Sequence, residues 1–312
     1  MKRMPRLFQI GLCALAVLCM TSSCQKEGRL SKKAKLSTVM MQKTVFCDGQ
    51  ELYHVGEQRT QQWFWDGNNL FRIDYTEDES SYSEIIFSEH RRIEQTRVDA
   101  YGLVSLFYYD GRYLDSIRVS AHGNPAYSCI FSHEDGKVSS MIIHPYGSTA
   151  DTTALTKGPL QLLPMVGVSL PQCVIDEQVA HMASKGKSQG DVEYAYQWNK
   201  NNVSSMVVTY ADGTKEQYSY TYDENRNPYY QCLTYYEGNA EGGLTNILSK
   251  NNVLTIVNRS GNRQSEYQYT YTYDGSLPMA SLLEYSYQAM NNQTLETSVY
   301  TVKEHRTYTY KD

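Results

Sequence analysis

Hydrophobic and polar residues alternate one by one along most of the chain from about residue 40 onward. Because side chains point to opposite faces of a β-strand in turn, this period of two predicts strands with one buried face. Turns of Asp-Gly or Asn type separate the runs, and Gly accepts the positive φ that a tight hairpin requires. We predict antiparallel hairpins at Trp65-Asp66-Gly67, Tyr109-Asp110-Gly111, Asp135-Gly136, Asp212-Gly213, Tyr222-Asp223 and Tyr273-Asp274-Gly275.

The runs between residues 194 and 222 allow a cross-strand register to be predicted. With a two-residue turn at Asp212-Gly213 and a loop over Asn199–Asn202, Ser205 lies between Tyr196 and Tyr220. One face then also carries Val203 and Val207, and the other carries Ser204, Met206, Val208, Gln217, Ser219 and Thr221. The candidate binding face consists of Tyr194, Tyr196, Trp198, Ser205, Tyr218, Tyr220 and Tyr222.

Tyrosine is unusually abundant, with 28 Tyr against 7 Phe. Its ring packs while its hydroxyl remains able to bind polar groups, so rings on a rigid sheet can stack on sugars or contact acyl chains. The alternative is that the rings form the core of a curled sheet. The core interpretation is favoured, because few other large apolar residues are present to build one.

One region lacks the strand period. Residues 158–171 are rich in Leu, Pro and Gly, and Pro171 can start a short helix that ends near Lys185-Gly186. We expect an irregular lid or plug insertion at about residues 151–190. A second irregular insertion is expected from Asn227 to Lys250.

The N-terminus has the features of a bacterial lipoprotein signal. Lys2, Arg3 and Arg6 precede an apolar run, Leu7 to Met20, that is too short to span a bilayer, and small residues follow before Cys24. We expect residues 1–23 to be a signal peptide, Cys24 to be lipidated, residues 24–38 to be a tether and residues 39–312 to form a single β-rich domain. Because Gln25 is not Asp, the outer membrane is favoured, on either its periplasmic or its cell-surface side.

Charge and motif content narrow the remaining functions. Without the three leader cations the net charge falls from −5 to −8, and no Lys/Arg cluster is present, so nucleic acid is not an expected partner. Neither the seven His nor the cysteines have metal-ligand spacing, and no catalytic motif or cofactor motif is found. We predict no metal, no cofactor and no enzymatic activity. The sequence leaves the disulfide state of Cys47, Cys129, Cys173 and Cys232 open.

An ordered series of motifs resembles a known family. The series comprises Tyr220-Thr221-Tyr222-Asp223, Asn227-Pro228-Tyr229, Leu248-Ser249-Lys250-Asn251-Asn252-Val253 and Tyr269-Thr270-Tyr271-Thr272-Tyr273-Asp274-Gly275. It resembles a Bacteroidetes lipoprotein family of unknown function described as having a porin-like fold, and the hairpins also look like YD repeats. The resemblance implies an all-β fold, a long antiparallel meander curled into a half-barrel or open barrel, and it carries no catalytic residue.

Two functions from different classes are predicted. The first is a non-catalytic envelope lipoprotein that presents its Tyr-rich sheet to a glycan or protein ligand and is held to the membrane by its N-terminal lipid. The second is a half-barrel in the periplasm that handles a lipid or lipoprotein. Exposed Tyr rings would favour the first function, and a closed groove lined by Tyr and by leucines such as Leu160 would favour the second.

Overall fold

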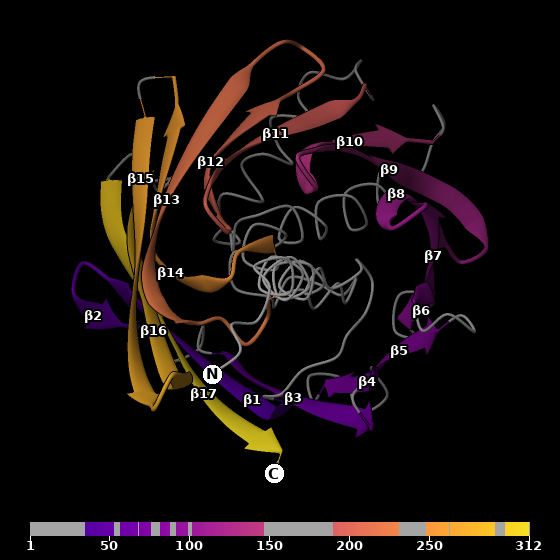
Figure 1. Ribbon diagram of the computed structural model, residues 1–312. Helices are drawn as coiled ribbons and strands as arrows, with labels where there is room; N and C mark the ends of the chain where they lie inside the picture. Colours follow the sequence, from indigo (N-terminus) through magenta and orange to yellow (C-terminus); the bar gives the residue numbers. More distant parts are fainter. Residues whose placement is uncertain are drawn as a thin grey trace, which may run out of the picture.

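The protein forms a closed antiparallel β-barrel in a computed structural model (Figure 1). The structure describes residues 35–52, 57–67, 69–75, 82–87, 92–98, 102–146, 190–230, 248–261, 263–290 and 297–311. Within these ranges one sheet contains 17 strands, of which 16 form the wall, while the two-residue strand β2 pairs only with β1. The predicted all-β, antiparallel fold class is confirmed.

The wall is a meander in which each strand pairs with the next along the chain, apart from β2. Its strands are β1 (Lys35–Cys47), β2 (Gln50–Glu51), β3 (Glu57–Asp66), β4 (Asn69–Tyr75), β5 (Tyr82–Phe87), β6 (Ile93–Val98), β7 (Leu103–Asp110), β8 (Tyr113–Ala121), β9 (Asn124–Glu134), β10 (Lys137–Pro145), β11 (Val192–Asn199), β12 (Asn202–Thr209), β13 (Lys215–Arg226), β14 (Asn251–Ser260), β15 (Arg263–Asp274), β16 (Leu277–Met290) and β17 (Thr297–Lys311).

Strand β1 closes the barrel. It pairs with β3 from Thr38 to Lys43 and with β17 over nearly its whole length, from the pair Lys35–Lys311 to the pair Cys47–Tyr300. The expectation of a half-barrel or open barrel is therefore wrong. Closure satisfies the N–H and C=O groups that the two edges of an open meander would leave unpaired. Because β1 begins at Lys35, the last four residues of the predicted tether also belong to the wall.

Five of the six predicted hairpin turns are confirmed, at Asp66-Gly67, Asp110-Gly111, Asp135-Gly136, Asp212-Gly213 and Asp274-Gly275. Asp135 and Gly136 both have positive φ, 50° and 76°, as expected for a two-residue turn between β9 and β10.

The prediction of a turn at Tyr222-Asp223 is wrong, because both residues lie inside β13. The Asp223 carboxylate accepts bonds from the Asn225 and Asn252 backbone N–H groups, both at 3.0 Å, and from the Tyr273 hydroxyl. This network holds a break in the β13–β14 register between Tyr222 and Arg226, so the Asp supports a bulge in place of a turn.

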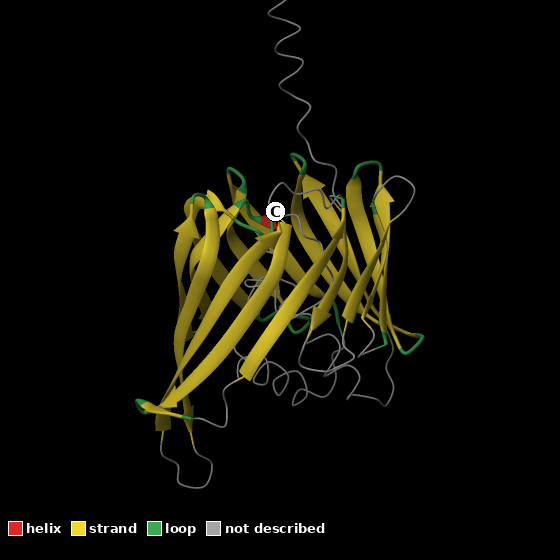
Figure 2. Ribbon diagram, turned by 90° about the horizontal axis from the view of Figure 1, so that it is seen from below, coloured by secondary structure: helices red, strands yellow, loops and turns green. Residues whose placement is uncertain are grey.

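The two rims of the barrel differ. Strand directions alternate around the wall, so the tips at Asp66-Gly67, Asp110-Gly111, Asp135-Gly136 and Asp274-Gly275 share one rim with the start of β1 and the end of β17. Figure 2 shows the C-terminal end among the short turns of this rim. The junction between β10 and β11 lies at the opposite rim.

Several predictions lie outside the described residues. These concern the signal peptide, Cys24, most of the tether, and the insertion at 151–190 apart from its last residue. Residues 227–230 and 248–250 bound the second insertion and are described: the Asn227 side-chain amide donates to the Ser249 carbonyl at 2.9 Å. Among the described helical residues, none belongs to a helix long and apolar enough to cross a bilayer.

Candidate functional site

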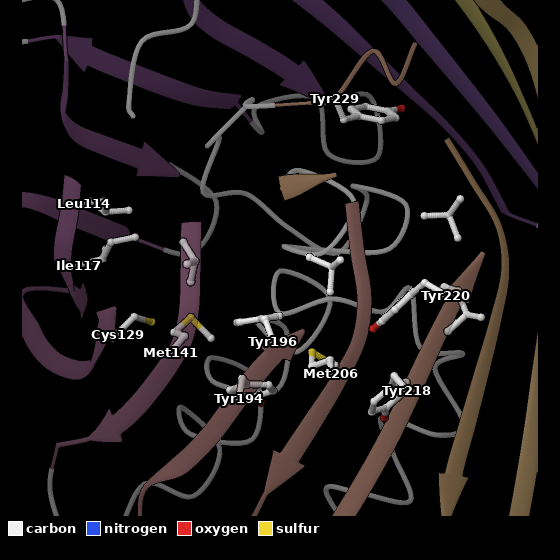
Figure 3. Packing of buried hydrophobic residues seen from close by; sticks show 14 of the residues in the cluster. Leu114, Ile117, Cys129, Met141, Tyr194, Tyr196, Met206, Tyr218, Tyr220 and Tyr229 are labelled. Atoms are coloured by element: carbon white, nitrogen blue, oxygen red, sulfur yellow. The ribbon is translucent and has the colours of Figure 1, made fainter. Parts of the chain in front are cut away.

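The aromatic residues of the candidate binding face lie on the inner face of the barrel. Tyr194 and Tyr196 on β11 are 2% and 6% exposed, and Tyr218 and Tyr220 on β13 have the same exposures (Figure 3). Trp198 and Tyr222 are partly buried and pack against the same cluster. The prediction that these rings share one face is confirmed, and they point into the barrel. Their role in binding stays a prediction.

Ser205 lies on the other face, so its predicted place between the rings is wrong. It pairs with Gln197 on β11 and with Ser219 on β13, and its hydroxyl donates to the Gln197 side-chain oxygen at 2.8 Å on the outside of the wall. Met206 occupies the inner position, opposite Tyr196 and Tyr218.

Two local irregularities explain the one-residue error. The pair Trp198–Val203 forms as predicted, but a register shift next to it leaves an extra residue on β12, as in a β-bulge. On the other side, β12 ends in the pair Thr209–Lys215, so the Asp212-Gly213 loop is longer than two residues. A one-residue slip sends every following side chain to the opposite face.

Trp198 and Tyr222 use their polar atoms to hold the wall together. The Trp198 indole N–H donates to the Val138 carbonyl on β10 at 2.8 Å. The Tyr222 hydroxyl donates to the Val203 carbonyl on β12 at 2.6 Å. Because the indole N–H and the hydroxyl both donate to backbone carbonyls, these two residues stabilise the wall and have no free donor to offer a ligand.

A belt of four inner residues crosses neighbouring strands at one level. Tyr196 on β11 pairs with Met206 on β12, Met206 pairs with Tyr218 on β13, and Tyr218 pairs with Asn258 on β14. Within the described residues, Tyr196 Oη and Asn258 Oδ1 are buried and have no hydrogen-bond partner. The same is true of Thr96 Oγ1 on β6. Sequence reasoning missed Met206 and Asn258, although the alternation of Val253, Ile256 and Asn258 could have placed Asn258 inside if the bulge near Thr255 had been recognised.

Glu216 is the acidic group beside this belt. Its carboxylate accepts from the Tyr218 hydroxyl at 2.6 Å. Burial, followed by the charge of Glu216, raises the pKa of Tyr218 well above its ordinary value, and burial raises the pKa of Tyr194 and Tyr196 in the same direction. These phenols are therefore neutral at physiological pH and act as hydrogen-bonding groups, not as anions.

The inner face has two chemically different halves. From β3 to β10 its buried residues are mainly aliphatic side chains, with five aromatic residues, Trp63, Trp65, Phe107, Tyr127 and Phe131. From β11 to β17 it is dominated by tyrosine. The buried tyrosines of this second half are Tyr194, Tyr196, Tyr218, Tyr220, Tyr267, Tyr269, Tyr285 and Tyr308.

The outer face is polar by comparison. On β13 the outward residues are Gln217, Ser219 and Thr221, and β15 presents Gln268, Thr270 and Thr272. Large outward apolar residues are 37–46% exposed and occur singly or in pairs on several strands: Met40 on β1, Phe64 on β3, Phe71 on β4, Leu106 and Tyr108 on β7, Ile130 on β9, Met279 on β16 and Val299 on β17. A membrane-spanning barrel has the reverse arrangement, an outward apolar band around its wall.

Nothing in the described residues forms a grouping of three or more His, Cys, Asp or Glu side chains that could hold a metal ion. Cys47 is a free thiol and Cys129 is buried on β9, while Cys173 and Cys232 lie outside the described residues. The prediction of no enzymatic activity stays a prediction.

Comparison with known proteins finds a similar fold among solved structures but no matching sequence family. No family model matches the sequence, and no curated protein matches it. Among solved structures, the fold is similar to a porin-like protein from Bacteroides uniformis, with 11% identity over 91% of this chain and 100% of that one and a TM-score of 0.48. A porin-like protein from Bacteroides vulgatus is 10% identical over 89% and 99% of the two chains, with a TM-score of 0.35. The lipoprotein family and the YD repeats stay predictions, and the proposals below rest on the residues of this barrel.

Proposed function

We propose that this chain is a non-catalytic envelope protein that binds an apolar molecule against the inner face of its barrel. The observation that supports the proposal most directly is the polarity of the wall at β13 and β15, where tyrosines point inward and Ser, Thr and Gln point outward.

The polar outer face favours a wall that stands in water. Placing outward residues such as Gln217, Gln268 and Thr270 in hydrocarbon would remove their side chains from water without supplying partners, at a cost of roughly 1–3 kcal/mol for each group on the protein scale. Attachment to the membrane would then come from lipid on Cys24, eleven residues before β1.

The size of the barrel favours an internal binding role. Eight-stranded barrels are filled by their own side chains, whereas walls of about 16 strands enclose more space than their side chains occupy. Moving an apolar molecule from water to this inner face would contribute about 25 cal/mol for each Å² of its own surface that is buried.

The position of the rings supports one of the two functions predicted from sequence. Tyr196 and Tyr220 are each 6% exposed, so these rings are poorly placed to act as an open platform for a surface glycan or protein. Their burial supports the lipid-handling alternative, now with a closed barrel in place of a half-barrel.

The proposal can be tested with the purified full chain. We expect native mass spectrometry to detect a co-purified apolar molecule, and the fluorescent probe N-phenyl-1-naphthylamine to bind saturably to protein from which that molecule has been extracted. Val208→Thr places a hydroxyl on the inner face at nearly constant volume and should weaken probe binding several-fold.

The neighbouring residue supplies a matched control. Val207 precedes Val208 on β12 and faces outward, so Val207→Thr should leave probe binding unchanged. Circular dichroism melts would establish that both variants fold. Absence of saturable binding to wild type, or equal effects of the two substitutions, would contradict an internal site.

A further inference from the structure

We infer that the belt formed by Tyr196, Met206, Tyr218 and Asn258 recognises the uncharged polar head of an amphiphile, a head that carries both a hydrogen-bond acceptor and a hydroxyl or amide donor. This inference rests on the proposed function and adds the chemical class of the ligand. It concerns the sector of the inner face that spans β11 to β14 (Figure 3).

The belt contains two buried polar atoms without partners. Tyr196 is 6% exposed and Asn258 is 8% exposed, and neither Tyr196 Oη nor Asn258 Oδ1 has a hydrogen-bond partner within the described part of the chain. Buried polar atoms are nearly always paired, because leaving one unpaired forfeits its hydration. Phe at position 196 and Leu at position 258 would fill similar space without that cost, so the polar atoms are best explained by a partner that the ligand supplies.

The two atoms have complementary chemistry. A phenol hydroxyl can donate to a carbonyl, ester or hydroxyl oxygen, whereas the Asn258 side-chain oxygen can only accept. Three strand spacings separate Tyr196 from Asn258, which corresponds to about 14 Å between their backbones along the wall. The polar head therefore needs separate acceptor and donor groups that reach both side chains, with Met206 and Tyr218 lying between them on the wall.

The charge near the belt favours an uncharged head. Glu216 lies beside it and accepts from the Tyr218 hydroxyl, the third member of the belt. The titratable groups that act on the Tyr196 phenol are Tyr194, Tyr220 and Cys129, and a phenol or a thiol is never a cation. A carboxylate or phosphate head would have the same sign of charge as the Glu216 carboxylate and be repelled by it, whereas an uncharged head would not.

The test compares three ligands of known chemistry. Monooleoylglycerol has an ester carbonyl and two hydroxyls, oleate has the same chain with a carboxylate, and N-phenyl-1-naphthylamine serves as the displaced apolar probe. We expect wild type to bind monooleoylglycerol more tightly than oleate at pH 8. Tyr196→Phe and Asn258→Leu should each weaken monooleoylglycerol about fivefold, the loss of one hydrogen bond, and leave probe affinity unchanged.

Tyr222→Phe is the matched control, because the Tyr222 hydroxyl already donates to the Val203 carbonyl. It should lower the melting temperature and leave the ligand preference intact. Tyr196→Phe should raise the melting temperature of the ligand-free protein, since it removes an unpaired buried hydroxyl.

The outcomes separate this inference from the proposed function. If the probe does not bind wild type, the proposed function fails and the inference with it. If the probe binds but oleate is preferred, or if Tyr196→Phe leaves the affinity for monooleoylglycerol unchanged, only the belt's role is overturned. If Tyr196→Phe lowers the melting temperature as much as Tyr222→Phe does, the Tyr196 hydroxyl stabilises the fold and the belt's role in binding is likewise overturned.

Discussion

The indole nitrogen of Trp65 donates a 2.7 Å hydrogen bond to the carbonyl of Leu36, and this bond joins β3 to β1 beside the seam that closes the barrel. Leu36 is 1% exposed and pairs with Tyr310 on β17, next to a register shift in the β1 ladder. Three strands from opposite ends of the chain therefore meet at one side-chain contact.

Trp65→Phe should destabilise the barrel. The substitution keeps an aromatic ring but leaves the buried Leu36 carbonyl without its indole partner, at a cost of about 1–3 kcal/mol. Urea unfolding followed by circular dichroism measures the change. Phe64→Leu, on the outer face of the same strand at 37% exposure, should stay within about 0.5 kcal/mol of wild type and serves as the control.

Truncation of the inward rings should be costly. Tyr196→Ala and Tyr220→Ala should each lower the free energy of unfolding by about 3–5 kcal/mol, as expected for a large aromatic residue removed from a packed interior. Tyr108, which is 38% exposed on the outer face, provides the comparison and should lose no more than about 1 kcal/mol on replacement by Ala. Thermal melts in which Tyr196→Ala behaved like Tyr108→Ala would mean that these rings are not part of the core.

Stability should fall steeply in alkali. Burial raises the pKa of Tyr194, Tyr196 and Tyr218 in the folded barrel above the value of about 10 that they have in the unfolded chain. The folded state then holds protons that the unfolded state releases, so this contribution is fully present below pH 10 and is lost progressively as the pH rises above it. Tyrosinate absorbance at 295 nm should appear together with loss of the β-sheet signal. Full ionisation of the 28 tyrosines with the sheet intact would refute this prediction.

Gly102 should tolerate a side chain less well than the other turn glycines. It has φ +53°, and an added Cβ would lie 2.6 Å from Nδ1 of His122. Gly275 has φ +57° and open space around it, so Gly275→Ala measures the cost of backbone strain alone, about 1–2 kcal/mol. We expect Gly102→Ala to cost more than Gly275→Ala. The double variant Gly102→Ala/His122→Ala should recover the excess, and a double-mutant cycle measures the coupling.

Lipidation of Cys24 should be readily detected in cells. Its position after small residues and a short apolar run predicts that labelled palmitate enters the wild-type chain and not Cys24→Ser. Cys47→Ser is the control, because Cys47 is a free thiol at the end of β1. Equal labelling of wild type and Cys24→Ser would rule out this anchor.

Sequence pattern predicted the strands and their faces better than their pairing. The alternation of Tyr267, Tyr269 and Tyr271 was sufficient to place these rings on one face, because the two-residue period is local. The face on which Ser205 lies could not be predicted in this way, because the register shift beside Trp198 adds one residue to β12 without changing the alternation of the run. Closure was also beyond local pattern, since the pair Lys35–Lys311 joins the two ends of the described chain.

The same limit applies to the proposed binding site. The aromatic residues were apparent from the sequence, but the two polar atoms that give the belt its chemistry were not. Asn258 lies between Tyr218 and Ser265 in the assembled wall, and the unpaired state of Tyr196 Oη depends on what every nearby strand offers. Such properties belong to the assembled wall.

The pairing of β1 with β17 also constrains when the protein can finish folding. Lys35 leaves the ribosome long before its partner Lys311 is made, so the first strand must wait while almost all of the wall is synthesised. During that interval the edges of β1 and β3, and their apolar faces, are open to other chains. We therefore expect truncation within β17 to leave an aggregation-prone open sheet, and the unfinished chain to need a holding chaperone until the last strand is available.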